Sequence, residues 1–218
     1  MTKHYKGAIF DLDGTLMDSL QDLWISVNHA LGQMGFPTRS IDEVRQFVGN
    51  GVGKLVQRAV PEGTSEAQTQ QCLQLFKQHY VEHCREHTAP YEGIIPLLQA
   101  LHQQGIRTAI VSNKLQSGVD ELADEHFRGL INVAIGEREG IRRKPAPDMV
   151  DLAVRQLGMQ KADCLYMGDS DVDVQTAVNA GLDCVAVLWG FRSRDVLLRA
   201  GATQFVQHPA ELLAFFGR

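Results

Sequence analysis

After Pro90 the chain alternates between short apolar segments and segments with helical spacing of apolar residues, and this alternation constrains the fold more than any other feature. Short apolar runs bounded by turn residues indicate buried strands, and apolar residues three or four positions apart indicate helices. The predicted strands are 107–111, 131–135, 163–167, 183–188 and 203–206, and the predicted helices are 94–104, 116–126, 147–157, 172–180, 193–200 and 209–216. Such an alternation with short connections favours a mostly parallel sheet with right-handed crossovers.

A further strand is predicted near the N-terminus, at Gly7–Phe10. This apolar run stops at the polar, glycine-containing loop Asp11–Thr15. A buried strand that ends in a polar loop is typical of parallel α/β sheets, which bind ligands at the carboxyl ends of their strands. The run therefore predicts a core strand with functional residues directly behind it.

Between the first strand and the alternating region, the sequence predicts helices only. Leu20, Leu23, Val27 and Leu31 recur at helical spacing, and the turn around Pro37 ends that helix. The other predicted helices are 41–47, 54–60 and one from Ser65 to about Glu86, with a flexible loop at 49–53. We therefore predict an all-helical domain at 18–87, inserted into an α/β core formed by 1–17 and 88–218.

The composition is that of an ordinary folded globular protein, and it argues against several classes of function. Hydrophobic residues make up 44% of the chain and charged residues 22%, which argues against disorder. The net charge is −5 and no basic stripe is visible, so a nucleic-acid partner is not expected. No apolar run approaches the roughly 18 residues that would span a membrane, so no membrane partner is expected.

The N-terminus and the cysteines predict a cytoplasmic protein. Residues 1–6 lead straight into the first strand, without the apolar region and cleavage site of a signal peptide. The four cysteines show no Cys-x-x-Cys spacing, so we interpret them as reduced thiols rather than a disulfide framework.

Polar residues collect where the predicted strands end. The first strand is followed by Asp11 and Asp13, the second by Ser112 and Asn113, the third by Lys144 and Pro145, and the fourth by Gly168, Asp169, Ser170, Asp171 and Asp173. Because ligands of an open parallel sheet bind outside the carboxyl ends of its strands, we expect these groups to line one crevice.

The acidic residues in this crevice predict a metal site. Asp11, Asp13 and Asp169 would crowd three carboxylates together, and two unit charges about 4 Å apart repel by roughly 4 kcal/mol at an effective dielectric of 20. A hard divalent cation relieves this repulsion, and carboxylate and carbonyl oxygens are the ligands that Mg2+ prefers. We therefore predict magnesium as the cofactor.

The same residues are suited to phosphoryl transfer. Asp11 is the predicted nucleophile, and Asp13 is the predicted general acid and base for the leaving oxygen and the attacking water. Lys144 would neutralise charge on the transferring group. The remaining predicted contacts to the phosphate come from Gly14, which allows a sharp turn, and from Thr15, Ser112 and Asn113, which supply donors.

These segments together resemble the four ordered motifs of the haloacid dehalogenase-like hydrolase superfamily. The matching residues are Asp11–Thr15, Ser112–Asn113, Lys144–Pro145, and Gly168–Ser170 with Asp173. Within the superfamily, the chain is most similar to the phosphoglycolate phosphatase-like group, through Val48–Gly51, Lys144–Asp148 and the stretch Gly168–Gly181. The resemblance covers essentially the whole chain.

The resemblance implies a Rossmann-like core with a mobile α-helical cap and a required magnesium ion. It implies metal ligation by the side chains of Asp11 and Asp169 and the main-chain carbonyl of Asp13, with Asp173 in a more distant or water-mediated contact. It also implies that cap residues contact the leaving group of the substrate. The loop Gly49–Lys54 is the candidate, with Lys54 as a substrate-binding residue, and residues 16–20 and 90–93 would form the hinge.

The expected function is hydrolysis of a small phosphomonoester, with phosphoglycolate as the resemblance-based substrate. The presence of Asp13 argues against the dehalogenases and phosphonate hydrolases that share this fold. A sugar-phosphate mutase and a non-catalytic regulatory relative remain open as alternatives. The expected partner is a small phosphorylated metabolite, and the protein is expected to be a monomer or a homodimer.

Two other features allow more than one interpretation. His79, His83 and His87 fall on one face of a predicted helix, which is more often a solvated face than a transition-metal site. Asp171 lies between two predicted site residues, but an acidic residue at a helix start is favoured by the helix dipole, and we interpret it in that way.

Overall fold

The computed structural model describes residues 4–217, which form two units. One unit comprises 4–16 and 90–217, and the other comprises 17–89. The first three residues and Arg218, which fall within the predicted core segments, lie outside the described residues. The segment predicted to lack a signal peptide thus begins with three residues that lie outside the described part of the chain. In the part of the chain that the structure describes, no helix has the length and apolar character needed to cross a bilayer.

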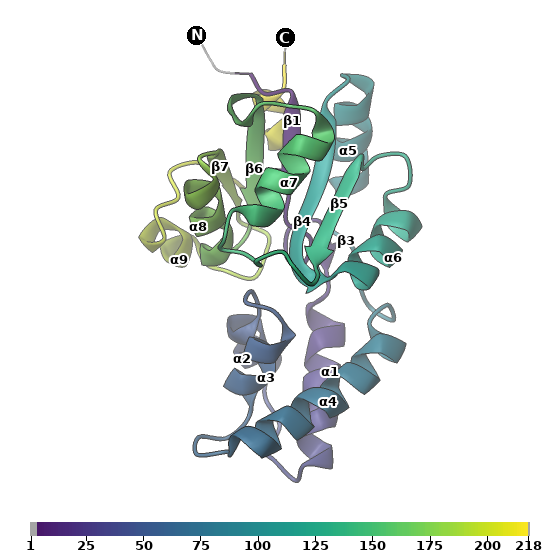
Figure 1. Cartoon of the computed structure of the whole chain (residues 1–218), viewed down its shortest axis with the longest axis vertical. Coiled ribbons are helices and arrows are strands. Elements are labelled where there is room, and N and C mark those ends of the chain that lie inside the picture. Colours follow the sequence, from purple (N-terminus) through teal and green to yellow (C-terminus); the bar gives the residue numbers. More distant parts are fainter. Residues whose placement is uncertain (1–3, 218) are drawn as a thin grey trace. The chain divides into compact units, whose positions relative to one another are not determined.

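A six-stranded sheet forms the centre of the first unit (Figure 1). Its strands are β1 (Gly7–Phe10), β4 (Arg107–Leu115), β5 (Val133–Glu137), β6 (Cys164–Gly168), β7 (Asp183–Val187) and β8 (Phe205–Val206). The order is β5-β4-β1-β6-β7-β8, and neighbouring strands are parallel. This confirms the predicted Rossmann-like α/β fold. The chain order reverses at β1, so a crevice is expected at its carboxyl end.

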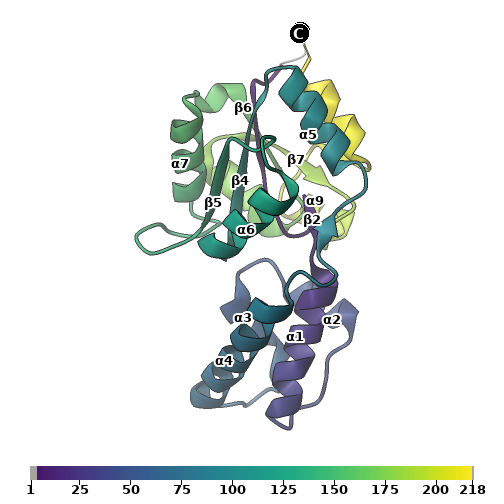
Figure 2. The same ribbon diagram turned by 90° about the vertical axis from the view of Figure 1, so that its right-hand side faces the viewer.

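Helices cover both faces of this sheet. They are α5 (Ile94–Gln103), α6 (Gln116–His126), α7 (Asp148–Leu157), α8 (Asp171–Ala180) and α9 (Arg194–Arg199), with the 3-10 helices η1 (Lys161–Asp163) and η2 (Pro209–Phe215). Figure 2 shows α5 and α7 on opposite faces of the sheet. On α7, Met149, Val150, Ala153 and Leu157 are buried against β1, β4 and β5. Each large apolar side chain contributes roughly 1.5–3 kcal/mol.

Two elements of the first unit differ from the prediction. Strand β4 continues to Leu115 instead of ending at 111, with an irregular register between Val111 and Leu115. Ser112 and Asn113 therefore lie within the strand, where their polarity hid its continuation. The predicted helix 209–216 is the 3-10 helix η2, which begins at Pro209. Such tight turns are common in short pieces.

The second unit is a four-helix arrangement of α1 (Leu20–Gln33), α2 (Ile41–Phe47), α3 (Val52–Ala59) and α4 (Glu66–His83). Reciprocal capping boxes start α2, through Ser40 and Glu43, and α4, through Ser65 and Gln68. Helix α3 begins at Val52, so it includes the end of the loop predicted at 49–53. The short strands β2 (Met17–Asp18) and β3 (Ala89–Pro90) pair with each other where the chain passes between the units.

Asp22 ties the two ends of the helical unit together. Its carboxylate, on α1, is 1% exposed and accepts hydrogen bonds from the Thr88 hydroxyl at 2.7 Å and the Thr88 N–H at 2.9 Å. The His87 N–H and the His87 Nδ1 also donate to it, at 3.1 Å and 2.9 Å. Burial alone would raise the pKa of Asp22, but these hydrogen bonds outweigh it and the pKa is lowered.

We expect Asp22→Asn to lower the free energy of unfolding by about 2–3 kcal/mol, because an amide group would face donors that need an acceptor. Urea denaturation at pH 7 measures the loss. Asp42→Asn is the matched control, since the Asp42 side chain is 77% exposed, and a change within about 0.5 kcal/mol is expected there. Because the folded pKa is depressed, the contribution of Asp22 is present at neutral pH and disappears as pH falls through that pKa. Equal stabilities of the two variants would contradict this assignment.

Candidate active site

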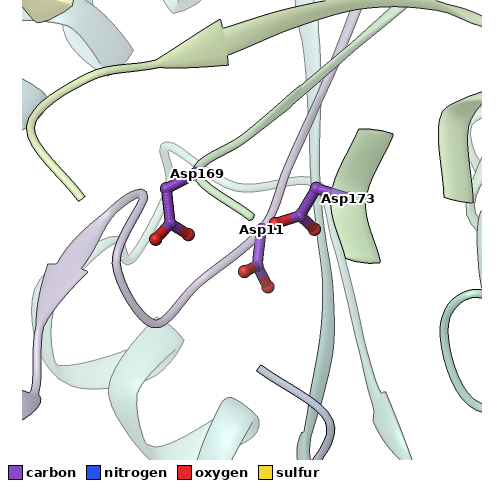
Figure 3. Close-up of side chains that lie close together, drawn as sticks. All are labelled: Asp11, Asp169 and Asp173. Carbon is purple, nitrogen blue, oxygen red and sulfur yellow. The ribbon is translucent and has the colours of Figure 1, made fainter. Parts of the chain in front are cut away.

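Three aspartates meet at the carboxyl end of the sheet (Figure 3). Asp11 follows β1, Asp169 follows β6, and Asp173 lies in the first turn of α8. One oxygen of each carboxylate lies within 4.8 Å of the others, and all three residues are buried. Within the described residues, this is the one group of three or more potential ligands that gathers so closely.

Lys144 is inserted between two of these carboxylates. Its Nζ lies 2.7 Å from Asp11 Oδ1 and 2.8 Å from Asp173 Oδ1. It also donates to the Tyr166 hydroxyl at 3.2 Å, and that hydroxyl donates to Asp173 Oδ1 at 2.9 Å. The Lys144 side chain is 2% exposed, so a buried cation and a phenol organise the carboxylates from inside the core.

The pKa shifts of the buried aspartates indicate that Lys144 alone does not balance their negative charge. Burial raises the pKa of Asp11 well above its usual range, and Asp173 raises it further, against the opposing effect of Lys144. Burial and Asp173 raise the pKa of Asp169 to about 7. Burial alone would lower the pKa of Lys144, but Asp11 and Asp173 raise it overall.

The donor set fits a divalent cation. Three ionised carboxylates against one ammonium group leave an excess of two negative charges in a buried space. Carboxylate oxygens are hard ligands, and Mg2+ is bound in proteins by a few carboxylates with waters and substrate oxygens. A divalent ion would balance the charge and restore the ionised forms of Asp11 and Asp169.

Asp173 is occupied by protein donors. Besides Lys144 and Tyr166 at Oδ1, the N–H and the hydroxyl of Ser170 donate to its Oδ2, at 3.0 Å and 2.5 Å. It is fully buried. Asp173 therefore orients Lys144 and starts α8 in this structure.

Gly14 is required by the close approach of Asp169. Its φ is +90°, in the region that favours glycine, and a Cβ placed there would lie 2.5 Å from Asp169 Oδ2. The turn predicted at this glycine brings the loop after β1 against the loop after β6. Thr15, beside it, is fully buried, and its hydroxyl donates to Asp169 Oδ1 at 3.3 Å. The donor expected to meet a phosphate is thus directed to a carboxylate.

Asp13 stands apart from the buried carboxylates. Its side chain is 17% exposed, and its Oδ1 lies 3.3 Å from Nζ of Lys114. The expectation that the carboxylates of Asp11, Asp13 and Asp169 crowd together is therefore wrong for Asp13, because Asp173 is the third member of the close group.

Ser112 and Asn113 lie on β4, the strand that pairs with β1. The Asn113 amide donates to the Lys144 carbonyl at 3.1 Å, and its Oδ1 accepts from the Lys144 N–H at 2.9 Å. This pair of bonds holds the Lys144 loop against β4, so Asn113 is a positioning group here. Ser112 is 2% exposed, and its Oγ accepts from the Lys114 N–H at 3.1 Å.

Sequence reasoning missed Lys114 and Tyr166. Lys114 directly follows Ser112 and Asn113, and its adjacency to a predicted site was a usable signal. Tyr166 lies inside the buried strand β6 and looks like an ordinary core residue until the fold brings its hydroxyl to Asp173. The contact joins β6 to the first turn of α8, seven positions further along the chain.

Other predicted residues lie outside this group. Asp171 is the first residue of α8, and its Oδ1 lies 3.3 Å from Arg192 Nε. Lys54, on α3, is exposed and donates to Gln57 Oε1 at 2.8 Å.

The predicted row of histidines is only partly on one helix, because α4 ends at His83 and His87 lies beyond it. The His79 ring stacks on His83 at 4.2 Å and on His29 of α1 at 4.1 Å, whereas His87 contacts Asp22. Among the described residues, these histidines do not form a close group of three ligands.

Comparison with known proteins identifies the family. Residues 8–187 match the family model described as haloacid dehalogenase-like hydrolase. The chain therefore belongs to the haloacid dehalogenase-like hydrolase family. Members of this family generally use Mg2+, which agrees with the buried carboxylates.

Similar proteins share a more specific name. A phosphoglycolate phosphatase of Pseudomonas syringae pv. tomato is 36% identical over 192 residues, which cover 85% of this chain and 70% of the relative. A phosphoglycolate phosphatase of Aquifex aeolicus is 30% identical over 184 residues, covering 84% of each chain. A crystal structure from Lactobacillus delbrueckii subsp. bulgaricus, provisionally named a phosphoglycolate phosphatase, has a TM-score of 0.94 and 38% identity, covering 99% of this chain and 100% of that one.

Proposed function

We propose that this protein is a magnesium-dependent phosphoric monoester hydrolase for a small substrate, with phosphoglycolate as the first candidate. The observation that carries the proposal is the buried Asp11, which lies at the end of β1 with its Oδ1 2.7 Å from the Lys144 ammonium. The family and the names of the relatives support the phosphatase class. The substrate is inferred from those names.

The proposed reaction has two steps. In the first, a carboxylate oxygen of Asp11 forms a bond to phosphorus, the ester P–O bond breaks, and Asp13 gives a proton to the leaving oxygen. In the second, Asp13 takes a proton from water, the water oxygen bonds to phosphorus, and the bond to Asp11 breaks. Lys144 offsets charge on the phosphoryl oxygens.

The metal would be held by the Asp11 and Asp169 side chains and the Asp13 carbonyl, while Asp173 orients Lys144. When bound, Mg2+ would supply positive charge to the carboxylates and to the transferring phosphoryl group.

The helical unit is proposed to act as a cap that contacts the leaving group. Lys54 and Asn50 are its proposed substrate contacts. Arg58 donates to Asn50 Oδ1 at 2.8 Å and to the Phe47 carbonyl at 2.7 Å, so the loop before α3 has an internal anchor. An anchored polar loop fits specificity for a small anionic substrate.

Phosphate release from a panel of esters tests the function. The panel contains phosphoglycolate, small sugar phosphates, nucleoside monophosphates and pyrophosphate, with and without magnesium. Magnesium-dependent release, highest with phosphoglycolate, is expected. Another ester ranking first would change the substrate and keep the class. Isomerised sugar phosphate without phosphate release would favour the mutase, and inactivity on all compounds would favour a non-catalytic relative.

Asp13→Ala is expected to separate the two chemical steps. Without a base to activate water, we expect turnover to fall by roughly 10²–10⁴-fold while phosphate stays on Asp11. Mass spectrometry of the protein mixed with substrate should show one added phosphoryl group on the peptide that contains Asp11. Wild type sampled in the same way should show little, because it hydrolyses the intermediate. An Asp13→Ala variant that turns over normally would remove Asp13 from the mechanism.

A further inference from the structure

The segment between β7 and α9 reaches back to the loop after β1. Trp189 lies in this segment, and its indole Nε1–H donates to the Thr15 carbonyl at 2.9 Å. The two residues are 174 positions apart in the sequence. The indole thus holds the main chain of the residue after Gly14. This residue lies in the same loop as Asp11 and Asp13.

The same segment holds Asp169 directly. The Phe191 N–H donates to Asp169 Oδ2 at 2.7 Å. The other oxygen, Oδ1, accepts from the Thr15 hydroxyl at 3.3 Å. Both oxygens of the Asp169 carboxylate are therefore oriented by hydrogen bonds. Phe191 orients one of them directly. Thr15 orients the other, and Trp189 in turn holds Thr15 through its carbonyl. An ionised carboxylate has about four acceptor positions, so these two bonds leave room for a cation.

Gly190, between these two contacts, is packed without space for a side chain. A Cβ placed on it would collide with Asp169 Cβ and with the Gly14 carbonyl oxygen. The backbone of the segment Trp189–Phe191 therefore packs closely against the loop that follows Asp11 and against Asp169. Neither the strand pattern nor the recognised motifs include this contact.

We propose that Trp189, Gly190 and Phe191 form a positioning clamp that holds Asp169 and the Thr15 main chain in the geometry needed to bind magnesium. The inference rests on the proposed function, because it assigns Asp169 to the metal. Groups that orient a metal ligand without touching the metal typically change metal affinity by about 10–100-fold when they are lost. The clamp acts through Thr15 and Asp169 rather than on the substrate.

Trp189→Phe tests the contact that acts on Asp169 through Thr15, because the substitution removes the indole N–H and keeps an aromatic ring. Trp24→Phe is the matched control, since its Nε1 donates to the Arg39 carbonyl at 2.8 Å within the helical unit. Calorimetric titration of each metal-free variant with MgCl2 measures the dissociation constant without turnover. We expect about tenfold weaker binding for Trp189→Phe and an unchanged constant for Trp24→Phe.

Melting temperatures of the metal-free variants separate positioning from simple packing. Both variants lose one hydrogen bond, so similar decreases in Tm are expected, whereas only Trp189→Phe should lose magnesium affinity. Wild-type affinity in Trp189→Phe, at any Tm, would overturn the role of Trp189. Wild-type protein that binds no magnesium would overturn both the clamp and the proposed cofactor. Failure of the clamp alone is therefore distinguishable from failure of the proposed function, because in that case wild type still binds magnesium.

Gly190→Ala tests the close packing, because the added methyl group must displace Asp169 or the Gly14 backbone. We expect up to about 100-fold weaker magnesium binding in protein whose circular dichroism matches wild type. Normal magnesium affinity in such protein would overturn the clamp. If this variant does not fold, the decision rests on Trp189→Phe, which introduces no added volume.

Discussion

Asp11→Asn is expected to reduce magnesium-dependent phosphate release by at least about 10⁴-fold, because an amide oxygen is a poor nucleophile for phosphorus. Asn has nearly the same shape, and the side chain sits in a buried position beside Lys144. The measurement is kcat/KM for the best ester of the panel, with the variant purified separately from wild type. No phosphoryl group should appear on its peptide by mass spectrometry.

The fold should survive this substitution. Burial and Asp173 raise the pKa of Asp11, so the charged carboxylate is disfavoured in the metal-free fold. A raised pKa adds stability at low pH that is lost as pH rises, and an uncharged Asn avoids that loss. Asp42→Asn, at a carboxylate of α2 that is 77% exposed, is the control for activity. Appreciable turnover by a clean Asp11→Asn preparation would contradict the nucleophile assignment.

Lys144→Met is expected to lower the free energy of unfolding of the metal-free protein by about 3–5 kcal/mol, because it leaves buried carboxylates without their cation. The Lys144 ammonium contacts Asp11 and Asp173 at 2.7 Å and 2.8 Å, with its side chain 2% exposed. Met has similar length and no charge, so little cavity forms. Urea denaturation in the presence of EDTA measures the loss, and phosphate release should fall with it.

The matched control for Lys144 is an exposed lysine with an equally short contact. Lys161 Nζ lies 2.6 Å from Asp151 Oδ1, but the two side chains are 45% and 43% exposed. Removal of such a surface pair typically costs at most about 1 kcal/mol, so Lys161→Met should change stability little. Magnesium should restore part of the stability of Lys144→Met, because it supplies charge to the same carboxylates. Equal losses in the two variants would show that Lys144 does not balance the buried charges.

The strand that carries Asp11 could be predicted from local sequence alone. A short run of apolar residues followed by a polar loop marks both the strand and its end within a few neighbouring residues. The parallel arrangement of the strands follows from their alternation with helices. The parallel sheet is confirmed, and the structure brings Asp11, Asp169 and Asp173 together. The extension of β4 to Leu115 escaped prediction, because Ser112 and Asn113 interrupt its apolar run.

The sequence by itself determined which residues carry the carboxylates and the ammonium group, and the order in which the strands present them. Tertiary structure alone decided what holds these groups: Asn113 on the Lys144 backbone, and Phe191 on Asp169. The physical reason is distance along the chain. A periodicity reports a residue's neighbours within one element, whereas a hydrogen bond between residues more than twenty positions apart exists only after the sheet has assembled.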